Sequence, residues 1–143
     1  MSEIEDIIKE LLTPLDEKYL GPHKFIYCYL PAEGGCPARE FLDSLPKEAK
    51  ASYAKQFEYH CQGHTIRGEK WRTWGDGLYE YKDIPSKSRL MHITEKGNLH
   101  ILLFGFTGKK EDKVDTVHVL RAQKMQLEYR TRAEAIRKRV KKK

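Results

Sequence analysis

The stretch from residue 77 to residue 110 constrains the fold most, because it holds three strand-like segments in only 34 residues. Each segment is rich in branched and aromatic side chains and is followed by turn-forming residues. The segments are residues 78–84, 89–94 and 99–106. Strands joined by such short connections pair as an antiparallel meander. Side-chain alternation then puts Glu80 and Lys82 on one face of the sheet.

The elements around this meander indicate the fold class. Residues 24–30 read as a strand between prolines, and helical spacing follows over about 38–45 and 46–61. After the meander, Asp115 is suited to cap a helix from about Thr116 to Arg132 or beyond. Two apolar stripes on this helix predict a broad inward face: Val117, Leu120 and Leu127, and Val119, Ala122, Met125 and Tyr129. We expect an α+β fold, with a small antiparallel sheet of one N-terminal strand plus the meander, packed with a helical hairpin and a C-terminal helix.

The chain divides into three parts by pattern. Residues 1–20 form an N-terminal extension in which apolar side chains recur at helical spacing up to Pro14. Such a helix either covers the core or binds a partner. Residues 21–132 form the main domain, and residues 133–143 form a basic tail.

Charge favours an anionic partner. The chain has 27 Lys and Arg against 21 Asp and Glu, a net charge of +6 and a pI of about 9.2. Residues 130–143 alone contain eight basic residues and one acid, Glu134. We expect residues 136–143 to fray in isolation and to order on nucleic acid, or else to act only as a solubilising tail.

Composition disfavours secretion, membrane insertion, metal binding and cofactor chemistry. Cys28, Cys36 and Cys61 are odd in number and lack paired spacing, which favours a reducing cytoplasm. No apolar run approaches the ~18 residues of a membrane span. His60, Cys61 and His64 have no second ligand cluster, so we expect no metal site, and the absence of phosphate-binding glycine motifs predicts no cofactor.

Basic residues gather at the predicted strand ends. They are Lys82, Arg89, Lys109 and Lys110. Neighbouring cations repel one another, and a bound anion relieves that repulsion. The set therefore predicts a surface that braces RNA phosphate, with an ordinary solvated rim as the alternative.

A second basic segment precedes the meander. Arg67, Lys70 and Arg72 interleave there with Trp71 and Trp74. Indole and guanidinium groups stack on unpaired bases, so we expect RNA binding by Arg67, Lys70, Arg72 and Trp74. The alternative is that the tryptophans close an edge of the sheet.

Five short sequence motifs occur in the order Glu40–Pro46, Gly77–Glu80, Ser88–Arg89, Phe104–Phe106 running into Lys109–Lys110, and Ala122–Tyr129. Together they resemble the RelE/ParE toxin superfamily of type II toxin–antitoxin modules, in particular its phage-derived HigB-like branch. The resemblance covers about residues 24–131. It implies a small α+β endoribonuclease that cuts mRNA on the ribosome without a metal, by attack of the RNA 2′-hydroxyl on the adjacent phosphate. The implied partners are mRNA, the ribosome and a cognate antitoxin, expected to be a helix-turn-helix protein encoded nearby; the oligomeric state is not indicated.

The resemblance also implies site residues. Arg89 matches the arginine at the scissile phosphate, and Lys110 falls at or beside a second phosphate-binding cation. Lys82 matches the basic residue that ends the family's three-residue motif, which begins here at Glu80. Where relatives have lysines that move protons, this chain has Leu78 and Glu80. The general base is therefore open among Glu80, His92 and His100, and strand parity puts His92 on the face opposite Arg89.

The missing lysines leave two other functions open. One is a non-nuclease toxin that resembles the ParE side of the superfamily and binds DNA gyrase. The other is a catalytically silent relative that only binds RNA or an antitoxin.

Overall fold

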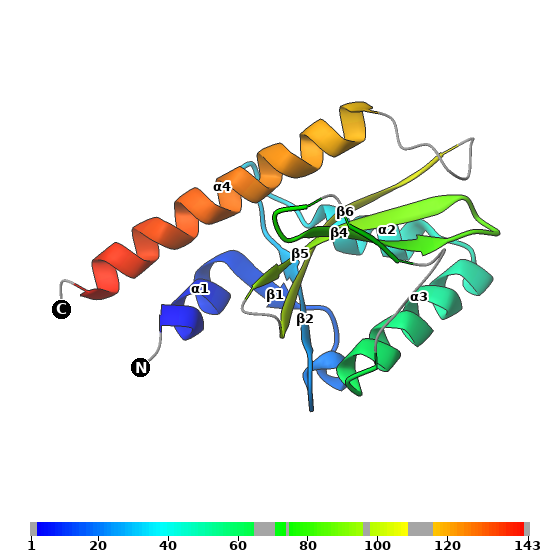
Figure 1. Cartoon of the computed structure of the whole chain (residues 1–143), viewed down its shortest axis with the longest axis horizontal. Coiled ribbons are helices and arrows are strands. Elements are labelled where there is room, and N and C mark those ends of the chain that lie inside the picture. The colour runs from blue at the N-terminus through cyan, green and yellow to red at the C-terminus, as the bar shows by residue number, and fades with distance from the viewer. Residues whose placement is uncertain (1–2, 65–70, 74, 96–97, 109–115, 142–143) are drawn as a thin grey trace.

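The computed structural model describes residues 3–64, 71–73, 75–95, 98–108 and 116–141, with only the backbone course of 71–73 (Figure 1). Helices and strands alternate in an α+β arrangement, as the sequence predicts. The elements are α1 (Glu3–Leu11), β1 (Leu12–Pro14), the 3-10 turn η1 (Glu17–Tyr19), β2 (Phe25–Tyr29), α2 (Pro37–Ser44), α3 (Lys47–Cys61), β3 (Trp71–Thr73), β4 (Leu78–Asp83), β5 (Ser88–Glu95), β6 (Leu99–Thr107) and α4 (Thr116–Lys141).

The sheet has six strands in the order β1-β2-β6-β5-β4-β3. The predicted meander is present, because β4, β5 and β6 pair antiparallel in sequence order. The prediction of a purely antiparallel, four-stranded sheet is wrong. β2 pairs parallel with β6, which the long connection through α2 and α3 permits, and β1 and β3 add one strand at each edge. β1 has three residues and ends in Pro14, so it gave no strand pattern, and its edge position tolerates the proline.

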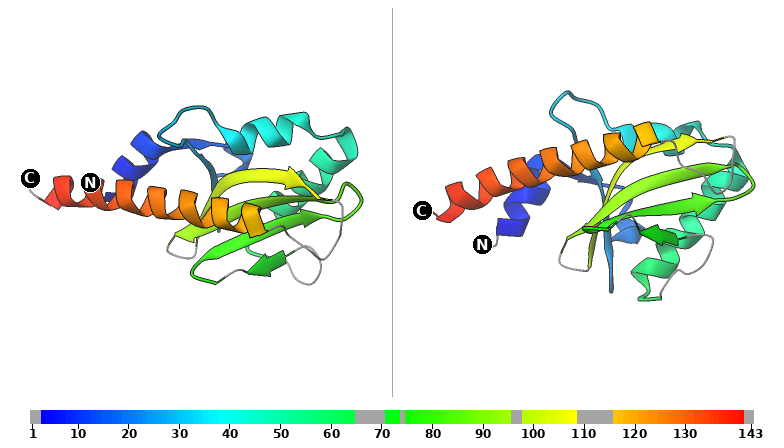
Figure 2. Two further views of the ribbon diagram at one scale, coloured as in Figure 1. Left: turned by 90° about the horizontal axis from the view of Figure 1, so that it is seen from above. Right: turned by 45° about the horizontal axis from the view of Figure 1, so that its top comes forward.

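Helices cover both faces of the sheet. α1 and α4 lie on one face, which we call the α4 face, and α2 and α3 lie on the other, the α3 face (Figure 2). Each face has its own apolar core. The core on the α4 face includes Met91, Phe104 and Tyr129, and the core on the α3 face includes Tyr53, Phe57 and Tyr81.

The N-terminal residues are part of the α4-face core. Ile7 and Leu11 of α1 are buried in it, and α1 packs against α4. The helix ends at Leu11, before the expected Thr13–Pro14, because the chain continues as β1 and pairs with β2. α1 therefore covers core, one of the two roles considered for it.

α4 continues to Lys141, which corrects the expectation of fraying for residues 136–141; residues 142 and 143 lie outside the described residues. Its inward side repeats at spacings of three and four residues through Ala122, Gln126, Tyr129, Ala133 and Ile136, and Ile136 is 4% exposed. Burial of this side holds the last turns in place, because apolar packing offsets the charge of the neighbouring basic residues. The first of the two predicted apolar stripes is not inward: Val117, Leu120 and Leu127 are exposed. In the described ranges, no helix is both long and apolar enough to cross a membrane.

Candidate nucleic-acid interface

A row of three residues crosses the sheet on the α4 face. Lys82 of β4 pairs in register with Arg89 of β5, and Arg89 pairs with Phe106 of β6. Paired residues on neighbouring strands point to the same side of a sheet. The meander therefore places a lysine, an arginine and an aromatic ring side by side, as strand alternation predicts for Lys82 and Arg89.

An imidazole from α4 stacks on the aromatic end of this row. The ring of His118, in the first turn of α4, lies 3.9 Å from the ring of Phe106 with an angle of 11° between the planes. Both side chains are half-buried. One helical turn further on, the guanidinium of Arg121 lies over the ring of Phe104 at 4.1 Å. Such a cation–aromatic contact fixes the guanidinium near the surface.

Together these groups can perform three tasks in RNA chemistry. An aromatic platform such as the Phe106–His118 pair can stack with an unpaired base. Lys82 and Arg121 can offset the charge of a phosphate. A histidine at such a platform can act as a general base, because a neutral imidazole has a free nitrogen lone pair.

Arg89 occupies the centre of the row but is buried. Its Nη1 donates to Oε2 of Glu80 at 2.9 Å, and the two side chains are 3% and 0% exposed. An ion pair taken out of water holds together firmly, since separation would leave a buried charge uncompensated. In this arrangement the guanidinium binds Glu80, and a phosphate at the surface would first meet Lys82 and the aromatic platform.

His92, the other proposed base, lies on the α3 face of the sheet. It is fully buried and stacks on Tyr81 at 4.3 Å. His100 lies 5.3 Å from it, and His60 stacks on His100 at 4.8 Å. Strand alternation thus separates His92 from Arg89, as parity predicted. His100 also lies on the α3 face, so neither histidine is near Arg89.

Burial keeps this histidine cluster neutral. It lowers the pKa of His60 to about 4 and that of His100 to about 3, with nearby charge on Lys24 as a further cause. Burial also moves the pKa of His92 well below the usual value. The Nδ1 atom of His60 and the hydroxyl of Tyr81 are 2.7 Å apart in a hydrogen bond. The three histidines therefore belong to the core on the α3 face.

Several predicted RNA-binding residues lie outside the described residues. They are Lys109, Lys110, Arg67, Lys70 and Trp74. Only the backbone of Arg72 is described, and it pairs in register with Glu80. In the described part of the chain, no group of three or more His, Cys, Asp and Glu side chains is arranged to hold a metal ion.

His118 and Arg121 are not among the site residues that the sequence predicted. His118 lies two positions after Thr116, the first residue of the predicted C-terminal helix. The helical spacing of His118, Arg121 and buried Ala122 could have indicated them, because residues three and four apart share one side of a helix. Their proximity to Phe106 and Phe104 depends on how α4 crosses the sheet.

Comparison with known proteins gives no relative: no protein-family model matches the chain, and no curated protein matches it.

Proposed function

We propose that this chain is the toxin of a type II toxin–antitoxin module and cleaves mRNA on the ribosome. The observation that carries the proposal is the Phe106–His118 stack on the face that also holds Lys82 and Arg121. The order strand, helical hairpin, meander and C-terminal helix supports it, because the resemblance to the RelE/ParE superfamily implies that order. The proposed setting is the cytoplasm, with mRNA and the ribosome as partners and a helix-turn-helix antitoxin encoded nearby.

In the proposed reaction, His118 takes the proton of an RNA 2′-hydroxyl. The 2′-oxygen attacks the adjacent phosphorus and the bond to the 5′-oxygen breaks. The 5′-oxygen takes up a proton from water, so that a cyclic phosphate and a 5′-hydroxyl end result. Lys82 and Arg121 offset the charge that builds on the phosphate, and Phe106 stacks with the flanking base. Removal of one such electrostatic contact typically lowers rates by about 10²–10³-fold.

Arg89 remains the residue that the resemblance assigns to the scissile phosphate. Its ion pair with Glu80 also gives it a structural role, because the pair fixes the Arg89 side chain at the centre of the row, between Lys82 and Phe106. Direct phosphate contact by Arg89 would require the pair with Glu80 to open.

The test is inducible expression followed by mapping of mRNA 5′ ends. We expect growth arrest and codon-phased cuts with the wild-type chain, and loss of both with His118→Ala at an unchanged protein level. His23→Ala is the control, because His23 is an exposed histidine whose backbone N–H donates to the carbonyl of Cys61 at the end of α3, away from the α4 face. If His118→Ala cuts mRNA at the wild-type rate, His118 is not the base; if the wild-type chain cuts no mRNA, the proposed reaction is wrong.

One observation favours a second candidate, a binding protein without nuclease activity. Arg89 is committed to Glu80 inside the protein, at the position that the resemblance assigns to phosphate contact. Intact mRNA with DNA damage in arrested cells would support a toxin that resembles ParE and binds gyrase. Normal growth on overexpression would support a silent relative that binds only RNA or an antitoxin.

A further inference from the structure

An exposed aliphatic stripe runs along the outer side of α4. Val117, Leu120 and Leu127 have 65%, 57% and 64% of their surface exposed. Spacings of three and seven residues put them on one side of the helix. The opposite side is filled by buried residues such as Ala122 and Tyr129, so the stripe is additional apolar surface that the fold itself does not use.

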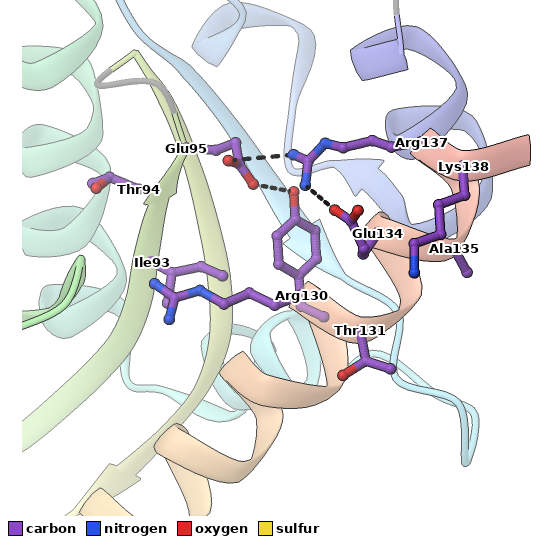
Figure 3. A pocket seen from close by; sticks show the side chains of 10 residues that line it. Ile93, Thr94, Glu95, Arg130, Thr131, Glu134, Ala135, Arg137 and Lys138 are labelled. Carbon is purple, nitrogen blue, oxygen red and sulfur yellow. Dashed lines mark hydrogen bonds and ion pairs between the residues drawn. The ribbon is translucent and has the colours of Figure 1, made fainter. Parts of the chain in front are cut away.

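Two hollows continue the stripe toward the end of α4. The first, about 250 Å³, is lined by Leu127, Gln123 and Arg130 of α4 and by Asp76 before β4. The second, about 580 Å³, lies between α4 and the end of β5 and is lined by Arg130, Thr131 and Lys138 of α4 and by Thr94 and Glu95 of β5 (Figure 3). Arg130 lines both hollows. We call the stripe and the two hollows together, from Val117 to Lys138, the track.

The walls of this track are held in place by polar contacts. The guanidinium of Arg130 donates to the backbone carbonyl and to the carboxylate of Asp76, at 2.7 and 3.0 Å. Tyr129 donates its hydroxyl proton to Glu95, which also pairs with Arg137 (Figure 3). A preformed surface binds with less loss of conformational freedom than a mobile one.

The charge of α4 selects the partner. The helix has eight Lys and Arg residues against two Glu. Lys124 lies between Leu120 and Leu127, and Lys138 lies at the far end of the track; both are exposed. Two copies of this helix would bring like charges together, so a second copy of the chain is disfavoured. The carboxylates of Asp76, Glu95 and Glu134 in the hollows already pair with Arg130 and Arg137. A bilayer surface is flat and would leave the two hollows empty, which disfavours a lipid surface.

We propose that the track from Val117 to Lys138 is a docking surface for an acidic amphipathic helix of another protein. Its apolar side chains would cover Leu120 and Leu127, and its carboxylates would lie beside Lys124 and Lys138. This is the helix-on-helix mode of recognition, in which apolar anchors at spacings of three and four residues supply the affinity. The inference does not depend on RNA cleavage, because the stripe and hollows are independent of the Phe106–His118 stack.

The test uses a designed acidic peptide of about 22 residues, the length that spans the track at 1.5 Å per residue. Leucines occupy positions with spacings of three and four, and glutamates flank them. Binding to the purified full chain is measured by fluorescence anisotropy without RNA. We expect at least about tenfold weaker binding by Leu120→Ser and by Leu127→Ser than by the wild type. Tyr59→Ser is the matched control, since Tyr59 is an exposed aromatic residue of α3 on the other side of the sheet.

Peptide controls separate the proposed partner from its alternatives. A peptide with lysines in place of the glutamates, and one with the same composition but scrambled leucines, should bind at least about tenfold more weakly. The proposal is overturned if the acidic peptide does not bind, if the scrambled peptide binds equally, or if the two serine variants bind as the wild type does. It is also overturned by a wild-type dimer that Leu120→Ser dissociates, or by anionic vesicles that compete with the peptide at this surface.

Discussion

The carboxylate of Glu80 and the guanidinium of Arg89 form an ion pair of 2.9 Å inside the protein, on two neighbouring strands of the sheet. Glu80 pairs in register with Met91, two residues along β5 from Arg89, so the contact is diagonal across β4 and β5. The pair links the two strands that carry Lys82 and the centre of the proposed RNA surface. Its first consequence is for stability.

We predict that Arg89→Ala lowers the free energy of unfolding by about 3–5 kcal/mol, because it leaves the buried Glu80 carboxylate without this partner. The double variant Arg89→Met/Glu80→Leu should recover most of that loss, since it removes both charges. Urea denaturation measures both. Equal stability of Arg89→Ala and the wild type would show that the pair does not hold in solution. Loss of toxicity in Arg89→Ala alone is therefore not evidence for a role in catalysis.

Gly105 of β6 has no side chain where the ring of Phe41 from α2 lies against the sheet. A Cβ atom at this position would overlap that ring. We predict that Gly105→Ala destabilises the protein by about 1–3 kcal/mol through overpacking. In a Phe41→Ala background the added methyl group should cost less, because the ring is absent. Thermal unfolding of the four variants tests this, and additive effects of the two changes would contradict it.

The buried histidine cluster predicts acid sensitivity. His60, His92 and His100 are neutral in the fold because burial lowers each pKa, whereas the unfolded chain binds protons below about pH 6.5. The unfolded state therefore gains protons first as the pH falls, and stability is lost progressively from about pH 6.5 toward the folded-state values. For His60 alone, with a folded pKa of about 4, the loss amounts to about 3 kcal/mol.

Urea midpoints at pH 7.5 and pH 5 measure the part of this loss that occurs above pH 5, about 2 kcal/mol for His60. His100→Gln should show a smaller decrease between the two pH values, because one titrating group is removed. His23→Gln, at an exposed position, is the control and should follow the wild type. A pH-independent midpoint between 7.5 and 5 would contradict the cluster's neutral state.

Removal of residues 133–143 tests the status of the basic tail. Ala133 and Ile136 are buried in the α4-face core, and Arg139 pairs with Glu10 of α1. We predict a loss of at least about 2–5 kcal/mol, the usual cost of removing one large buried aliphatic side chain. A stability equal to that of the full chain would show that the last turns of α4 do not pack in solution.

A charge-only variant separates folding from nucleic-acid binding. Lys138→Gln/Lys141→Gln changes two exposed residues and should leave stability within about 0.5 kcal/mol of the wild type. If these lysines bind phosphate, RNA affinity falls in the variant and its dependence on salt becomes less steep. The slope should change by roughly 0.7 for each phosphate of single-stranded RNA that is no longer neutralised. Unchanged RNA affinity and an unchanged salt dependence would mean that these lysines only make the chain more soluble.

The sequence by itself determined the elements that depend on local patterns. Runs of branched and aromatic residues bounded by turn residues predicted β4, β5 and β6, and helical spacing with flanking prolines predicted α2 and α3 to within a few residues. Parity along each strand was enough to separate His92 from Arg89, because alternation is a property of the backbone.

The tertiary structure decided which of these groups meet. The parallel pairing of β2 with β6, and the β1 and β3 edges, depend on contacts between distant segments. The path of α4 across the sheet placed His118 on Phe106 and turned Leu120 outward, although helical spacing predicted that both apolar stripes face inward. The sequence likewise predicted Arg89 as a surface cation, whereas in the fold it is buried beside Glu80. Burial and charge pairing arise between residues far apart in sequence, so local patterns cannot specify them.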